Sequence, residues 1–259
     1  MACMRMWARS ALQYRTSLAL LMVNSTLIAA LELAALLVVY GNVPSLGGFS
    51  LSEALYLYGT AQTAFFISDL LFTGTEYLSA RIRMGTFDSL LIRPVGVLPQ
   101  VFADQFTPRR FCPLIASCGA LAAGLSTAPI HWTWLRVALV PYTLLTGVAI
   151  FGAIWVFVGA FQILVTDATE VMNIVTYGGQ YMTSYPLSLY GRNLMWFLTF
   201  AVPLGFVNWQ PTLYVLGHPD PLGLPTPFRF AGPLFAAALW GVALIAWRAA
   251  LRHHRSTGS

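Results

Sequence analysis

Residues 18–40 read LALLMVNSTLIAALELAALLVVY, an apolar run whose one charged residue is Glu32. A membrane-spanning helix needs about 20 predominantly apolar residues, so this run is long enough to cross a bilayer. It is too long for the apolar core of a signal peptide, and further apolar runs follow it. The run therefore predicts an uncleaved first span and places the chain among helical membrane proteins.

The composition of the whole chain supports that class. Of its 259 residues, 58% are hydrophobic and 9% are charged, whereas a soluble domain carries roughly 25% charged residues. A soluble chain of this size could not bury so much apolar surface in one core. The composition excludes a soluble enzyme and predicts an all-α polytopic membrane protein.

The apolar runs predict six spans. Five of them are expected at about 18–40, 54–75, 111–130, 137–163 and 231–247. Two segments compete for the remaining span, 168–185 and 191–208. The first is fairly polar, and the second is more hydrophobic but contains Pro203. Hydropathy alone favours 191–208.

The arginines indicate the orientation. The chain has 14 of them and no lysine, and eleven fall in residues 1–17, in the loop 76–110 and in the C-terminal tail. Basic residues accumulate on the cytoplasmic side of a membrane, so both termini and the loop are expected there. Only one of 168–185 and 191–208 can then cross fully, and the other is re-entrant or interfacial. Residues 1–17 are expected to form a cytoplasmic interfacial helix, followed by a transmembrane domain over 18–259.

The basic excess thus reflects contact with membrane lipid and not a nucleic-acid partner. Arginine without lysine, together with abundant Ala, Gly and Pro, is typical of a GC-rich bacterial genome. We expect a multi-pass protein of the bacterial plasma (inner) membrane.

Residues 81–94, RIRMGTFDSLLIRP, give the strongest local pattern. Gly85 permits a sharp turn. Thr86 is a good N-cap, and Asp88 falls in the first turn, where its charge favours the helix dipole. Pro94 ends the element. The pattern predicts a short amphipathic helix of about two turns in the cytoplasmic loop.

Three apolar residues of this element, Phe87, Leu90 and Leu91, recur at helical spacing. One interpretation is a docking helix whose apolar face fills a groove on a cytoplasmic partner. The alternative is a solvated loop that anchors two spans at the headgroups. The residues that would couple the chain to a partner are Arg83, Gly85, Phe87, Asp88, Leu90, Leu91, Arg93 and Pro94.

Polar residues at membrane depth form a second group of candidates. Glu32 and Asp69 lie within predicted spans, where a charge is costly unless it faces a partner or a cavity. They would line a translocation path for a cationic or amphipathic substrate, or they are carboxyls bonded to neighbouring helices. Further candidates for the path are Asn24, Gln62 and Asn173. A secondary transporter with Glu32 and Asp69 as coupling-ion sites is the alternative function.

No catalytic or metal site is expected. A phosphate-binding loop of the type Gly-x-x-x-x-Gly-Lys-Ser/Thr requires a lysine, and this chain has none. The intramembrane segments hold no paired carboxylates or Ser/His arrangement. His218 and Asp220 form only an isolated pair, too few ligands for a metal.

Several segments together carry a resemblance to a known family. They are Tyr14-Arg15, 48–53 (GFSLSE), 85–94 (GTFDSLLIRP), 185–190 (YPLSLY), 199–204 (TFAVPL) and 206–211 (FVNWQP). From about residue 14 to 217 the chain resembles the permease subunits of ABC-2-type exporters, in a bacterial branch that often pairs two different permeases with one ATPase. Phe49 and Thr86 depart from the pattern, which usually has Trp and an acidic residue there.

The resemblance implies an ABC-2 exporter-type fold with six transmembrane helices and a coupling helix between the second and third. It implies 168–185 as the fifth span and 191–208 as a re-entrant segment before the last span. It further implies a dimer with a second permease subunit, identical or a paralogue, above two copies of an ABC ATPase that binds ATP and Mg²⁺. The expected function is ATP-driven export of an amphipathic small molecule, drug, lipid or natural product, by a chain without catalytic activity of its own.

Overall fold

The computed structural model describes residues 15–103, 108–165 and 169–254. Within these ranges the chain is helical and forms no named strand, which confirms the all-α class. Residues 1–14 of the predicted interfacial helix lie outside the described residues. The long helices are α2 (Arg15–Asn42), α3 (Leu51–Phe72), α7 (Phe111–Thr127), α8 (Trp134–Leu164), α9 (Thr169–Thr183) and α12 (Gly232–His253).

Short elements gather at the two ends of the long helices. At one end lie η1 (Thr73–Tyr77), α4 (Leu78–Arg83), α5 (Asp88–Leu91), α6 (Val97–Ala103) and η2 (Pro108–Arg110). The opposite end holds η3 (Leu187–Tyr190), α10 (Gly191–Phe200), η4 (Leu204–Phe206), α11 (Trp209–Leu216) and η5 (Thr226–Phe230).

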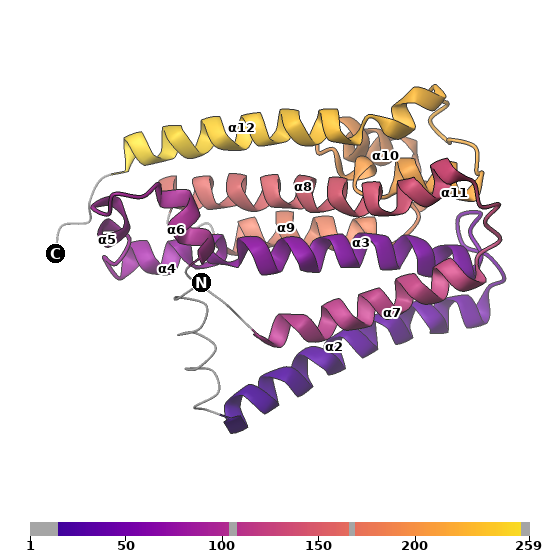
Figure 1. Ribbon diagram of the computed structural model, residues 1–259, viewed down its shortest axis with the longest axis horizontal. Coiled ribbons are helices and arrows are strands. Elements are labelled where there is room, and N and C mark those ends of the chain that lie inside the picture. The colour runs from indigo at the N-terminus through magenta and orange to yellow at the C-terminus, as the bar shows by residue number, and fades with distance from the viewer. Residues whose placement is uncertain (1–14, 104–107, 166–168, 255–259) are drawn as a thin grey trace.

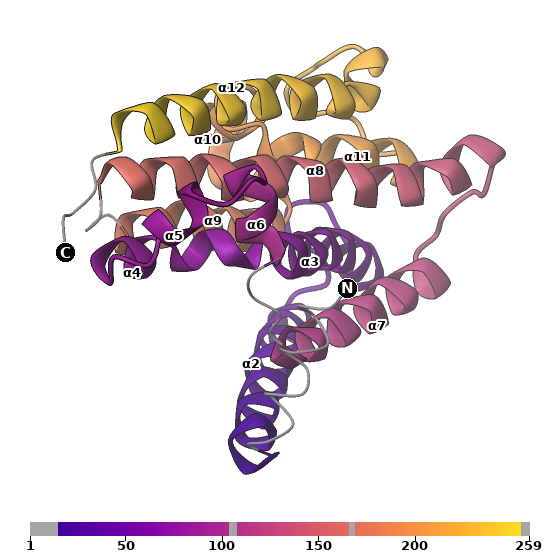
Figure 2. The ribbon, with the colours of Figure 1, turned by 60° about the vertical axis from the view of Figure 1, so that its left-hand side comes forward.

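The long helices form a bundle from which two members diverge. Helices α8 and α12 run side by side, and α3 crosses α8 at an angle (Figure 2), whereas α2 and α7 lean away toward the end that holds α4–α6 (Figure 1). Helix α3 packs on both α7 and α8, and α12 packs on α8. Helix α2 packs chiefly on α7. The bundle is therefore built around α3 and α8, with α2 on its edge.

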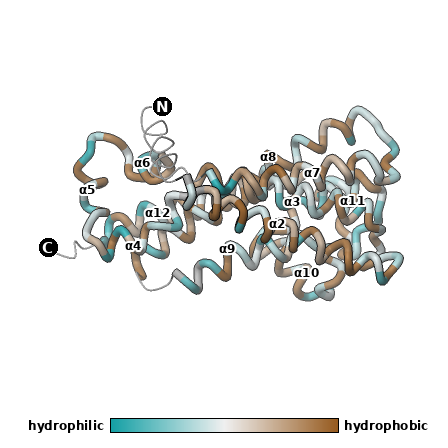
Figure 3. Tube along the Cα trace, turned by 90° about the horizontal axis from the view of Figure 1, so that it is seen from below, coloured by the Kyte–Doolittle hydropathy of each residue, from teal (hydrophilic) through white to brown (hydrophobic). Residues whose placement is uncertain are grey.

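Among the residues that the structure describes, four helical segments are long and apolar enough to cross a membrane: 19–42, 108–127, 134–164 and 232–253. Helix α3 is not among them, because polar residues such as Gln62 and Asp69 lower its hydropathy. Most residues of α3 are nevertheless buried against other helices. A polar group that faces protein avoids the cost of facing lipid. Figure 3 shows hydrophobic stretches along the long helices and hydrophilic ones near α4 and α5.

The two segments that competed for one span have different shapes. Residues 169–183 form one helix, α9, about 22 Å long. Residues 191–208 are broken into α10, a turn at Pro203 and η4. Proline has no backbone N–H and its ring clashes with the preceding turn, so α10 ends after about 15 Å. Residues 191–208 do not form the single helix that a full crossing requires.

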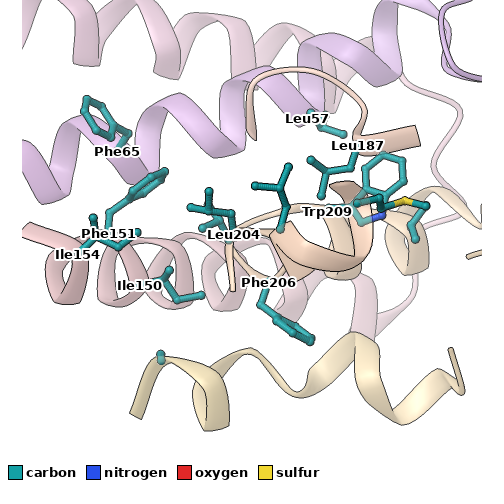
Figure 4. Close-up of a cluster of buried hydrophobic side chains, with 14 of the residues drawn as sticks. Leu57, Phe65, Ile150, Phe151, Ile154, Leu187, Leu204, Phe206 and Trp209 are labelled. Atoms are coloured by element: carbon teal, nitrogen blue, oxygen red, sulfur yellow. The ribbon is translucent and has the colours of Figure 1, made fainter. Parts of the chain in front are cut away.

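The main apolar core lies between α3, α8 and the segment from η4 to α11 (Figure 4). Phe65 of α3 contacts Phe151 of α8 edge to face, with ring centroids 5.1 Å apart. Phe206 of η4 and Trp209 at the start of α11 are fully buried in the same cluster. The core thus fixes the broken segment against the bundle.

Candidate functional site

The predicted coupling element begins with a tight turn. Gly85 has φ +67°, a conformation that favours glycine. The backbone N–H groups of Thr86 and Phe87 both donate to the carbonyl of Arg81. The Thr86 hydroxyl donates to the same carbonyl at 3.2 Å. The expectation that Thr86 caps the following helix is therefore wrong, since its side chain closes the turn instead.

The helix after this turn is shorter than predicted. Helix α5 covers only Asp88–Leu91, one turn, and its N-cap residue Phe87 makes no side-chain capping bond. The chain then turns back, because the Gln100 side chain donates to the carbonyls of Leu90 at 3.0 Å and Val95 at 2.7 Å. The expected two-turn helix is replaced by one turn inside a folded-back loop.

Burial divides the predicted docking residues into two groups. Phe87 and Leu90 are 1% and 2% exposed and pack in a cluster with residues of α4, α8 and α12. The chain's own helices cover these two side chains, so they do not belong to the exposed side of the loop. Leu91 is 42% exposed and Ile92 is 85% exposed. The exposed apolar residues of this helix therefore lie one or two positions later in the chain than predicted.

We call residues 83–95 the 83–95 segment; Phe87 and Leu90 are buried within it, whereas most of its other residues are exposed. Its exposed apolar residues are Met84, Leu91, Ile92 and Val95. Arg83, Arg93 and Pro94 are exposed among them. A hollow of about 300 Å³, lined in part by Tyr77, Arg81 and Met84, adjoins it. Apolar side chains flanked by arginines beside a hollow are typical of a protein-binding surface.

A contact far apart in sequence fastens α5 to the end of α12. The Nε2 of His254 lies 3.1 Å from Oδ1 of Asp88, and the His254 side chain is buried. The His254 ring also meets the Phe87 ring edge to face, with centroids 5.0 Å apart. Sequence reasoning missed His254, because it read as one of several polar residues in a basic tail.

Two of the predicted path residues meet in one pocket. A cavity of about 240 Å³ lies between α2, α3, the start of α7 and α9, and both Glu32 and Asp69 line it. Its other lining side chains were not among the candidates. They include Phe66, Arg110, Tyr177, Gln180 and Tyr181. Helix α9 supplies three of these, which the sequence alone did not place beside α2.

A buried ionic group borders this pocket. Arg110 forms ion pairs with Asp69 and with Glu76, the latter at 2.5 Å between Nη2 and Oε2. The hydroxyl of Tyr177 lies 3.3 Å from Oε1 of Glu76. In the sequence, Arg110 indicated only that the loop 76–110 faces the cytoplasm. In the structure its side chain is buried and connects the start of α7 with residues of α3 and η1.

The remaining path candidates lie apart from the pocket. The Gln62 side chain donates to Ser184 at 3.1 Å and accepts from Gln180 at 2.8 Å, so it is one hydrogen bond away from the lining. Asn24 is exposed on α2, and Asn173 is half-buried on α9. Neither lines the pocket.

His218 and Asp220 both contact other side chains of this chain. The Nε2 of His218 lies 2.7 Å from Oε1 of Glu53, and its ring stacks on Phe49. Oδ2 of Asp220 accepts from Gln210 at 3.0 Å. Within the described ranges, no group of three or more His, Cys, Asp or Glu side chains is arranged to hold a metal ion.

Comparison with known proteins gives one match. A protein-family model described as ABC-2 family transporter protein matches residues 26–258. The matched range contains the 83–95 segment and all but Ser25 of the pocket lining. No curated protein and no solved structure matches the chain.

Proposed function

This chain belongs to the ABC-2 transporter family, and from that premise we propose that it is the permease subunit of an ATP-driven exporter. The family and the four apolar helices make it a multi-pass membrane protein whose partner is an ABC ATPase. They give no support to the alternative, a secondary transporter with Glu32 and Asp69 as ion sites. The observation that carries the proposal further is the exposed apolar 83–95 segment at one end of the bundle.

ATP hydrolysis belongs to the partner in this proposal. The chain has no lysine, so it cannot supply the lysine that contacts the β- and γ-phosphates in a phosphate-binding loop. ATP and Mg²⁺ would be held by the separate ATPase. The role of this chain is then mechanical: it receives the motion of the ATPase and changes the state of the pore.

The 83–95 segment is the proposed contact with the ATPase. Leu91 and Ile92 supply exposed apolar surface at its tip, while Phe87 and Leu90 anchor the loop in the bundle. Arg93 lies near Arg81, and burial together with that like charge lowers the pKa of Arg81. The positive charge beside the apolar tip favours a partner groove with an acidic edge.

The anchored side of the loop explains how a push would reach the membrane. Phe87 and Leu90 share a packed cluster with Ala153 and Val156 of α8 and Trp247 of α12. The His254–Asp88 contact adds a polar connection to the end of α12. Because packed side chains move together, displacement of α5 would displace α8 and α12.

The proposed topology has six spans: α2, α3, α7, α8, α9 and α12. Residues 191–208, the broken segment that contains α10 and η4, are re-entrant on the outer side. Two features support this arrangement: α4, which contains Arg81 and Arg83, lies at the opposite end of the bundle from α10 (Figure 1), and 191–208 is not one helix. Both termini are cytoplasmic in this topology.

The proposed assembly contains two permeases and two ATPases in the bacterial inner membrane. Helix α2 leaves most of its apolar surface uncovered, since only 11% of its most apolar window is buried. Lipid or a second permease, identical or a paralogue, would cover it. ATP binding switches such a pair between inward-open and outward-open states, and transport follows if the substrate binds the two states with different affinities. An amphipathic small molecule, drug, lipid or natural product is the expected cargo.

Co-purification with a candidate ABC ATPase from the same genome tests the proposal. Ile92→Glu places a charge on the exposed tip and should abolish co-purification without unfolding the chain. Trp134→Glu is the matched control: Trp134 is 91% exposed at the start of α8, at the opposite end of the bundle. It should leave the complex intact. Loss of the complex in both variants, or in neither, would overturn the proposed contact.

A further inference from the structure

The charges around the pocket do not balance. Arg110 is paired with Asp69 and Glu76, and Arg109, the other arginine of the lining, acts electrostatically on Glu76. Two arginines thus offset two carboxylates at one end of the pocket. Glu32 remains, and no arginine or histidine in the described ranges forms an ion pair with it.

Hydroxyl groups hold Glu32 in place without neutralising it. The Tyr181 hydroxyl lies 3.0 Å from Oε1 of Glu32, and the Tyr58 hydroxyl also bonds the Glu32 side chain. A hydroxyl that donates to a carboxylate positions it and satisfies a lone pair, but the net charge stays. An ionised carboxylate at membrane depth requires a counter-ion.

The rest of the pocket suits an apolar body that carries a positive charge. Phe66, Tyr177 and Tyr181 supply aromatic rings to the lining, and an aromatic face attracts a cation. Ile28 and Tyr181 are exposed, so part of the lining is open toward the surroundings of the bundle. The cavity volume of about 240 Å³ is slightly below the range of about 300–1,000 Å³ that is typical of small-molecule sites.

We propose that this pocket binds a lipophilic monovalent cation, an ammonium or phosphonium group on an apolar body, with the Glu32 carboxylate as its counter-ion. The inference rests on the proposed function, because it takes the pocket as part of the transport path. The same cationic chemistry occurs in a free small molecule and in an ammonium-bearing lipid headgroup, so the experiment must separate these two sources.

The test measures binding of tetraphenylphosphonium to the purified full-length chain in phosphatidylglycerol nanodiscs by equilibrium dialysis. Glu32→Gln keeps the size of the side chain and one acceptor oxygen for Tyr181 but removes the charge, and it should weaken binding by about tenfold or more. Glu170→Gln removes the same charge from an exposed position at the start of α9 and should leave binding unchanged. Tetraphenylborate, an anion of similar shape, should show no binding that depends on Glu32.

A second variant keeps the test valid if Glu32→Gln does not fold. Ile28 lines the pocket four residues before Glu32 and is half-exposed, so Ile28→Arg places an internal cation within reach of the carboxylate. It should abolish binding, whereas Leu20→Arg, which adds the same charge at an exposed position of α2 outside the pocket lining, should leave binding unchanged. Addition of phosphatidylethanolamine to the nanodiscs separates the sources: competition with the probe identifies a lipid headgroup, and its absence identifies a free cation.

Equal binding by the native chain and Glu32→Gln, or equal Glu32-dependent binding of the anion, would overturn the proposal. The measurement needs no ATPase. Failure of this test with an intact ATPase complex would therefore refute the pocket alone, and normal binding by a chain that forms no such complex would refute the proposed function alone.

Discussion

His254 Nε2 lies 3.1 Å from Asp88 Oδ1, which fastens the end of the last long helix to the one-turn helix α5. The two residues are 166 positions apart in the chain. Because Asp88 sits between the buried Phe87 and the exposed tip at Ile92, this contact lies between the proposed ATPase surface and the bundle. A movement of the loop would therefore be transmitted directly to α12.

A double-mutant cycle of Asp88→Asn and His254→Gln measures this connection. We expect an interaction free energy of about 0.5–1 kcal/mol, because the Asp88 side chain is partly exposed and solvent screens the pair. Thermal unfolding of the purified chain gives the stability term. In the complex, each single variant should retain the ATPase but lower substrate-stimulated ATP hydrolysis, and unchanged stimulation would contradict a role in coupling.

Leu90 and Leu91 are neighbours with opposite roles. Leu90→Ala opens a cavity in the cluster with α8 and α12 and should cost about 2–5 kcal/mol of unfolding free energy. Leu91→Ala removes exposed surface and should change stability by no more than about 0.5 kcal/mol. Binding of the ATPase should be weakened more by Leu91→Ala than by Leu90→Ala, when only the molecules of Leu90→Ala that still fold are compared. Denaturant unfolding and a pull-down on the same preparations check both statements, and equal stability costs would be inconsistent with the burial of Leu90.

Substitutions in the ionic group at the pocket should differ in how much they lower the stability of the protein. Arg110→Gln removes the buried cation that pairs with both Asp69 and Glu76, whereas Asp69→Asn leaves Arg110 paired with Glu76. Removing one partner of a buried pair costs about 3–5 kcal/mol, so Arg110→Gln should be the more destabilising change. The double variant should recover part of the loss. Thermal unfolding of all three variants is the measurement, and a greater loss in Asp69→Asn would refute the arrangement.

Glycine permits the close packing of α3 on α7. A Cβ added to Gly124 would lie 2.3 Å from the backbone nitrogen of Tyr56, and one added to Gly59 would lie 2.4 Å from Cα of Leu121. Gly124→Ala should therefore separate the two helices and lower the unfolding temperature. Gly119→Ala, on the same helix with no atom within 4 Å of the added carbon, is the control and should leave that temperature unchanged or slightly raised. Equal effects at the two glycines would be evidence against the crossing.

The long helices could be predicted from the sequence because length and hydropathy decide them. Helix α8 spans 134–164 against a predicted 137–163, and α12 spans 232–253 against 231–247. The break in 191–208 was harder to foresee, since hydropathy measures composition and Pro203 acts on the backbone. The polar residues of α3 lower its hydropathy, yet burial between α7 and α8 makes them tolerable.

The candidate site could be predicted only where all of the informative residues lie within one element of the sequence. The loop 81–94 could be recognised from its glycine, apolar residues and proline. Which of its apolar residues face outward depends on the contacts with α8 and α12, which lie far away in the chain. The same limit applies to the pocket, where Glu32 and Asp69 were candidates but Arg110, Tyr177 and Tyr181 could be identified only once α2, α7 and α9 were placed together.

Site-directed cross-linking tests the central claim most directly, that the 83–95 segment contacts an ABC ATPase. Ile92→Cys and Trp134→Cys would be made in a chain whose three native cysteines are replaced by alanine, then labelled with a photoreactive maleimide in the assembled complex. We expect a cross-link to the ATPase from position 92 and none from position 134. No cross-link from position 92 in an intact complex, or equal cross-linking from both positions, would contradict it.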